Sequence, residues 1–122
     1  MAQSEQHRAS TAAQTISDQV TSWPGVSAHD HRFGGVEFRL GNRQLGHLHG
    51  DQIADIPLKR ALRDELVAAG RVRIHRWRPD SGWVTVDIHT DQGRDEAVRL
   101  LRAGYESAVR ARGRRGEAGV AR

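Results

Sequence analysis

The sequence contains no cysteine, which excludes disulfides, thiolate metal sites and cysteine nucleophiles together. It has no apolar run long enough to span a bilayer, and residues 1–8 are polar where a signal peptide would be hydrophobic. Aromatic residues make up only 5% of the chain, so the core has to be assembled mainly from Val, Ile, Leu and Ala. These absences favour a cytoplasmic protein that does not contact a membrane, and 122 residues are enough for one domain.

Lysine is nearly absent as well, since Lys59 is the one lysine among 19 basic residues. The formal net charge of +4 arises in residues 110–122, which hold five arginines and one glutamate, so residues 1–109 are neutral overall. A segment of Gly, Ala and Arg buries little apolar surface. We therefore predict a disordered basic tail over residues 111–122, a disordered start over residues 1–8 and a single domain over residues 9–110. The neutral body makes nucleic acid the least favoured partner.

Hydrophobic periodicity predicts three helices and two groups of strands. Helical spacing of apolar residues predicts a first helix capped by Ser10 or Thr11, a second that begins at Pro57 and a third capped by Thr90 or Asp91. Alternation of apolar and polar residues predicts strands over residues 36–40, 43–49, 53–56, 71–77 and 83–88. The polar residues 27–32 are expected to form a connection. The order of helix, three strands, helix, two strands and helix predicts an α+β domain with a largely antiparallel sheet.

The densest group of chemically active side chains lies at His47-Leu48-His49, with Asp51 just beyond a glycine. Successive side chains of a strand point to opposite faces, so His47 and His49 are expected to project together, flanked by Leu45. Two histidines at this spacing can reach one metal ion, with His75 or Asp51 as a third ligand. They can also act as general bases, because imidazole titrates near neutral pH.

Alternation across the whole sheet extends this polar face. The apolar strand residues are expected on the side covered by helices: Val36, Phe38, Leu40, Ile74, Val84, Val86 and Ile88. The opposite face then carries Glu37, Arg39, His47, His49, Arg73, His75, Trp83, Thr85 and Asp87. Such a face can be a ligand site, the interface of a homodimer or a solvated surface.

The residues of this face suit a small planar or phenolic ligand. We assign His47, His49 and His75 as candidate catalytic residues that orient or deprotonate it. The candidate ligand-binding residues hold the anion or stack on the ring: Arg39, Arg73, Trp83 and Asp51. A hydrogen-bonded strand surface is the alternative for the histidines, and Trp77 and Trp83 could instead cover a sheet edge. The segment His29-Asp30-His31 is expected to be a solvated loop.

Several motifs resemble the luciferase-domain family, a group of small, mostly bacterial proteins of undetermined role that are related to fungal luciferases. The resemblance covers about residues 23–110 and is carried by Val36-Glu37-Phe38-Arg39, Gly46-His47-Leu48-His49, Asp55-Ile56-Pro57, Asp80-Ser81-Gly82-Trp83-Val84 and the helix around Tyr105. In the order of its elements the chain is also similar to YjbR-like double-wing proteins, which are often described as DNA-binding.

The luciferase resemblance implies a chemistry. Fungal luciferases oxidise a hydroxylated pyrone with molecular oxygen and are not known to need a metal or flavin, so the resemblance implies oxygenase-like activity without a cofactor or metal. Matching positions in those enzymes favour His47, His49, His75 and Trp83 as the site. The fungal enzymes are much longer, and Gly104 stands where relatives more often have Ser. In a distant relationship of this kind, the fold is expected to be preserved more often than the activity.

Overall fold

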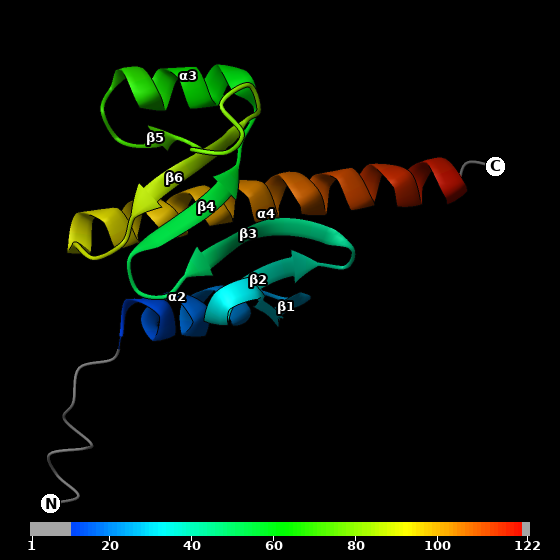
Figure 1. Ribbon diagram of the computed structural model, residues 1–122. Helices are drawn as coiled ribbons and strands as arrows, with labels where there is room; N and C mark the ends of the chain where they lie inside the picture. Colours follow the sequence, from blue (N-terminus) through cyan, green and yellow to red (C-terminus); the bar gives the residue numbers. More distant parts are fainter. Residues whose placement is uncertain (1–10, 121–122) are drawn as a thin grey trace, which may run out of the picture.

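The computed structural model describes residues 11–120 (Figure 1), so the predicted disordered start lies outside the described residues. The described elements follow in the order α2 (Ala12–Thr21), β1 (Val26–His31), η1 (Arg32–Gly34), β2 (Gly35–Leu40), β3 (Arg43–His49), β4 (Ile53–Pro57), α3 (Arg60–Ala68), β5 (Arg73–Ile74), β6 (Trp83–Asp87) and α4 (Asp91–Val120). This confirms the predicted α+β class. No helix of the described part is both long and apolar enough to cross a membrane.

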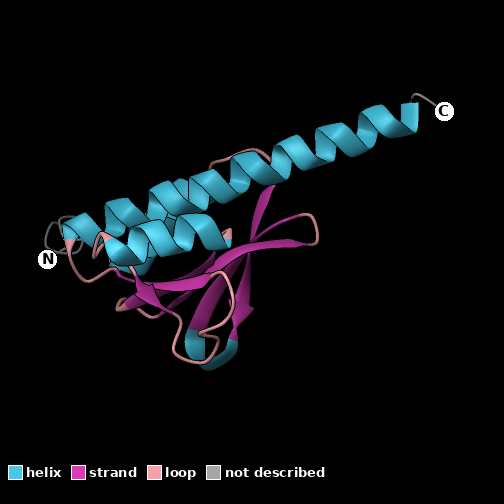
Figure 2. Ribbon diagram, turned by 90° about the horizontal axis from the view of Figure 1, so that it is seen from above, coloured by secondary structure: helices cyan, strands magenta, loops and turns pink. Residues whose placement is uncertain are grey.

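The strands form one sheet in the order β1-β2-β3-β4-β6-β5, and every neighbouring pair is antiparallel. The α-helices lie on one side of this sheet (Figure 2), where α4 packs against β3, β4, β6 and α2. Phe38, Val84, Val86 and Ile88 are buried on that side, as their alternation predicts. The other side of the sheet is therefore free to carry polar side chains.

Strand β1 corrects the expectation of a polar connection over residues 27–32. All six residues from Val26 to His31 are in register with β2. As an edge strand, β1 leaves most of its side chains exposed, and only its two end residues are partly buried. Backbone pairing to β2 holds it in place, so its sequence shows no alternation of apolar and polar residues that could reveal a strand.

Two further boundaries differ from the prediction. Pro57 ends β4 instead of beginning a helix, and α3 begins at Arg60. The extended chain continues there because the backbone N–H of Leu58 donates to the carbonyl of Gly82 at 2.9 Å. Strand β5 is only two residues long, and Ile74, which was expected in the core, is 45% exposed. A strand this short is fixed by its pairing with β6 rather than by burial of its own side chains.

Helix α4 continues through Val120, although we expected order to end at residue 110. Its C-terminal part extends past the sheet (Figure 1). Ala and Arg are good helix formers, and adding a turn to an existing helix is far easier than nucleating a new one. The packed turns around Leu101 and Tyr105 supply that existing helix. Composition alone could not show this coupling between the two parts of the chain.

Candidate functional site

A β-bulge in β3 sets which side chains face the site. The register with β2 pairs Phe38 with Gly46 but Arg39 with Gln44, so Leu45 has no partner across the ladder. This extra residue shifts the alternation by one position. Leu45 is consequently buried in the core, and the expectation that it flanks the histidines is wrong. Gln44 takes that place and its side-chain nitrogen lies 3.0 Å from Nδ1 of His47.

The site is centred on the carboxylate of Asp55 in β4, which is 3% exposed. Three imidazoles approach the same oxygen, Oδ2: the Nε2 atoms of His49, His47 and His75 lie 2.8, 3.3 and 3.4 Å from it. The hydroxyl of Thr85 in β6 donates to the other oxygen, Oδ1, at 2.7 Å. Residues from β3, β4, β6 and the segment after β5 therefore share one buried carboxylate.

These neighbours keep Asp55 ionised. Burial raises the pKa of its carboxyl, but the hydrogen bonds from His47 and Thr85 and the positive charges of His75 and His47 outweigh that effect and lower the pKa to about 2. At neutral pH the site thus contains a fixed negative charge beneath a layer of imidazoles.

Edge strand β1 adds a histidine that sequence reasoning assigned to a solvated loop. The ring of His31 stacks on that of His47, with centroids 4.2 Å apart and planes inclined by 20°. Its Nδ1 lies 3.3 Å from Oε1 of Glu37, which also pairs with Arg39. Burial and the neighbouring positive charge of His47 lower the pKa of His31, against the opposing effect of Glu37. Only the pairing of β1 with β2, which the sequence does not reveal, brings His31 to this face.

These groups line a pocket of about 790 Å³ on the face away from the helices. Its wall consists of histidines, acids, aromatic residues and arginines, namely His31, Arg32, Glu37, Gln44, His47, His49, Ile53, Asp55, Arg73, Ile74, His75, Arg76, Trp77, Arg78, Trp83 and Thr85. The ring of Trp83 lies 5.3 Å from that of His47 and 6.1 Å from that of His75. A concave surface therefore combines an indole wall with titratable groups.

The structure brings most of the predicted site residues together. His47, His49, His75, Arg73 and Trp83 all line the pocket. Among these, Arg73 is paired with Asp87 of the neighbouring strand at 2.6 Å.

Two predicted ligand-binding residues are placed differently. The guanidinium of Arg39 pairs with Glu37, and Arg39 is not part of the pocket wall. Asp51 lies in the turn between β3 and β4, where its carboxylate accepts the N–H of Ala13 at 2.9 Å, in the first turn of α2. Its proximity to His49 in sequence is lost because the chain reverses at the turn.

Asp55 is the main residue of the site that our sequence assignment omitted. A signal for it exists, because an acid between Ala54 and Ile56 interrupts an apolar strand. A charge at such a position is buried only with a partner. The identity of those partners depends on the sheet order, which places β6 and β3 on either side of β4.

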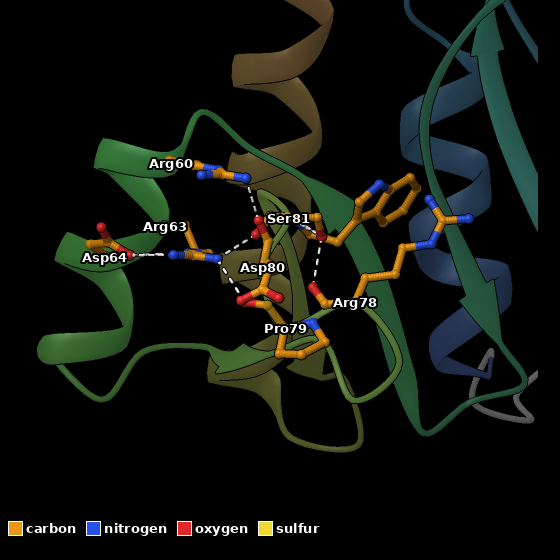
Figure 3. Close-up of polar contacts among 8 residues, drawn as sticks. Arg60, Arg63, Asp64, Arg78, Pro79, Asp80 and Ser81 are labelled. Carbon is orange, nitrogen blue, oxygen red and sulfur yellow. Dashed lines mark hydrogen bonds and ion pairs between the residues drawn. The ribbon is translucent and has the colours of Figure 1, made fainter.

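Helix α3 holds the turn that connects Arg78 to Trp83, two residues of the pocket wall (Figure 3). The Nη1 atom of Arg63 donates to the carbonyls of Pro79, at 3.0 Å, and Ser81. Arg60 donates to the carbonyl of Asp80 in the same turn. The backbone carbonyls before Trp83 are thus fixed by two guanidinium groups, which gives the start of β6 a defined position.

Aromatic and cationic groups alternate along this part of the pocket wall. The guanidinium of Arg78 lies 5.7 Å from the ring centre of Trp83, and that of Arg76 lies 4.9 Å from the ring of Trp77. The backbone N–H of Trp77 donates to Nδ1 of His75 at 3.1 Å. In its neutral form His75 must then carry its proton on Nε2, the atom that faces Asp55.

One family model matches the part of the sequence that carries most of this site. The model described as the luciferase domain matches residues 42–104, just over half of the chain. The matched segment runs from the start of β3 into α4 and contains Asp55 together with His47, His49, His75 and Trp83. Searches of curated proteins and of solved structures find no significant match. The chain belongs to the luciferase-domain family.

Proposed function

We propose that the pocket binds a small planar ligand that carries an acidic phenol or enol, and that the site removes the proton of that group. The observation that carries the proposal is the convergence of His47, His49 and His75 on the buried carboxylate of Asp55. Imidazoles held by a carboxylate are a common arrangement for moving a proton at neutral pH.

The dimensions and lining of the pocket suit such a ligand. A volume of about 790 Å³ is within the range of small-molecule sites. Trp83 provides an aromatic surface on which a planar ring can stack. Arg32, Arg76 and Arg78 line the same pocket, and their positive charge would stabilise the anion formed when the ligand loses its proton.

His49 is the imidazole best placed to accept the proton. Its side chain is 35% exposed, against 12% for His47 and 10% for His75. Its Nε2 faces Asp55, while its Nδ1 has no hydrogen-bond partner among the described residues. A carboxylate that accepts one ring N–H fixes the tautomer whose other nitrogen is free to take a proton. His47 and His75 then help to keep Asp55 ionised.

An enzymatic form of the proposal adds reaction with oxygen. A phenolate or enolate is richer in electrons than its neutral acid, and fungal luciferases, to which the family is related, oxidise a hydroxylated pyrone with molecular oxygen. Oxidation is a second step that can be tested apart from binding, since oxygen consumption is measured independently of affinity.

The test is a screen of catechols and hydroxypyrones against metal-free protein. Binding should raise the melting temperature, and the absorption spectrum of the bound ligand should shift to that of its anion. His49→Gln should abolish the spectral shift and weaken binding, whereas His29→Gln, an exposed β1 residue outside the pocket wall, should change neither. The proposal fails if no ligand of this class binds, or if the anion forms equally well in His49→Gln.

Exposed apolar residues at the rim favour one alternative, a homodimer through this face. Trp77 is 76% exposed and Ile74 is 45% exposed, and both line the pocket. Sedimentation of the wild-type chain and of Trp77→Ala distinguishes the two ideas. A wild-type dimer that dissociates in Trp77→Ala supports assembly through the pocket, and a monomer in both supports an open ligand site.

A further inference from the structure

We infer that His31, His47 and His49 form a binding site for a divalent transition-metal ion of the zinc class at the wall of the pocket. One ring nitrogen from each histidine lies within 4.8 Å of the others. The inference goes beyond the proposed function, because it concerns a metal ion rather than the phenolic ligand and assigns a role to His31.

The sheet itself assembles the three rings. His31 ends β1, and His47 and His49 lie on β3, with β2 between these strands. The residue of β2 that pairs with His31 is Gly35, so no side chain separates the rings at that point. A Cβ on Gly35 would meet the carbonyl oxygen of Leu48 at 2.4 Å and the Cβ of His31 at 3.4 Å, so a larger residue does not fit.

The three rings lie close together, two of them stacked and two edge to face. The ring of His49 is inclined by 86° to that of His47, with centroids 4.7 Å apart, while His31 stacks on His47. Their ring nitrogens are therefore near enough to one another to hold one ion.

In His31 and in His49, a carboxylate faces the ring nitrogen that would not bind the ion, as is common around protein-bound zinc. Nδ1 of His31 faces Glu37 at 3.3 Å, which leaves its Nε2 available, and Nε2 of His49 faces Asp55 at 2.8 Å, which leaves its Nδ1 available. Such partners fix the ring orientation and increase the basicity of a ligating histidine. His47 contacts Gln44 through Nδ1 and Asp55 through Nε2, so it would release one of them on binding.

The donor set limits the choice of ion. The chain has no thiolate, and imidazole nitrogens are preferred by zinc and by divalent cobalt, nickel and iron rather than by magnesium or calcium. Three protein ligands leave a fourth position open toward the pocket, as in catalytic zinc sites. From the sequence, His75 or Asp51 was the candidate for the third ligand, and the structure supplies His31 instead.

The test uses the full, untagged chain after removal of metals, with no phenolic ligand present. Calorimetric titration with Zn²⁺ should show one ion per chain, and Co²⁺ should give the visible absorption of a nitrogen-ligated ion. His31→Ala should weaken Zn²⁺ binding by more than about 100-fold, because losing only an outer partner of a ligand costs about 10–100-fold. His29→Ala, an exposed β1 residue that is not one of the three histidines, should leave the affinity unchanged.

Melting curves show whether each variant is still folded. Zn²⁺ should raise the melting temperature of the wild type and of His29→Ala but not that of a folded His31→Ala. The inference is overturned if neither Zn²⁺ nor Co²⁺ binds, or if His31→Ala binds them as tightly as the wild type. Because a metal-bound His49 no longer accepts a proton, the proposed function is tested on metal-free protein, and either idea can fail without the other.

Discussion

Replacing Asp55 with asparagine should change how the stability of the protein depends on pH. The folded-state pKa of Asp55 is about 2 against an ordinary value of 3.8. A depressed pKa contributes stability that is fully present above the unfolded value and is lost as the pH falls through the folded value. The shift corresponds to about 2 kcal/mol at 1.36 kcal/mol per pKa unit. Asparagine keeps the shape of the side chain but cannot ionise, so this contribution disappears.

Urea denaturation between pH 2 and pH 7, with EDTA present to exclude metals, measures the effect. The free energy of unfolding of Asp55→Asn should fall short of the wild-type value most clearly near pH 5, and the deficit should shrink by about 2 kcal/mol as the pH falls to 2. Asp80→Asn, in an exposed turn, should follow the wild-type curve throughout. Parallel curves for wild type and Asp55→Asn would refute the idea that this carboxylate is held ionised by its neighbours.

Two glycine substitutions should act in opposite directions. A Cβ on Gly46 would meet Cδ2 of Leu101 at 2.8 Å and the backbone oxygen of Asp55 at 3.0 Å. Gly46→Ala should therefore destabilise the protein by about 1–3 kcal/mol. An unchanged melting temperature would contradict the close packing of α4 on β3. A Cβ on Gly104 meets nothing within 4 Å. Gly104→Ala should therefore stabilise α4 by about 0.5–1 kcal/mol, measured by urea denaturation. A loss of stability would show that the space beside Gly104 is not open.

The parts of the fold that depend on local pattern could be predicted from the sequence. The caps of α2 and α4 bear this out, since Thr11 accepts the N–H of Gln14 at 3.1 Å and Thr90 accepts that of Gly93 at 3.0 Å. Alternation in β2 and β6 likewise identified the buried face. β1 was not predicted because an edge strand depends on its partner. Pro57 was wrongly taken as the start of a helix, because the bond from Leu58 N–H to the carbonyl of Gly82, which keeps the chain extended there, is not visible in the sequence.

The same division applies to the candidate site. The spacing of His47 and His49 placed both rings in the pocket, because residues two positions apart on a strand point to the same face. The alternation of side chains placed Leu45 on the wrong face, because no residue pattern predicts the bulge in β3. The face of His31 could not be predicted either, because it depends on the pairing of β1 with β2. Asp55 has a visible signal, a charge within an apolar strand, but its three imidazole partners come from elements that only the sheet order brings together.

A purely structural role explains the arrangement around Asp55 poorly. One buried carboxylate needs few partners, and the hydroxyl of Thr85 already satisfies one of its oxygens at 2.7 Å. Three imidazoles nevertheless face the other oxygen, at 2.8, 3.3 and 3.4 Å. Titratable nitrogens gathered beside an indole and open to a pocket are better explained by the protons or ions that they can bind.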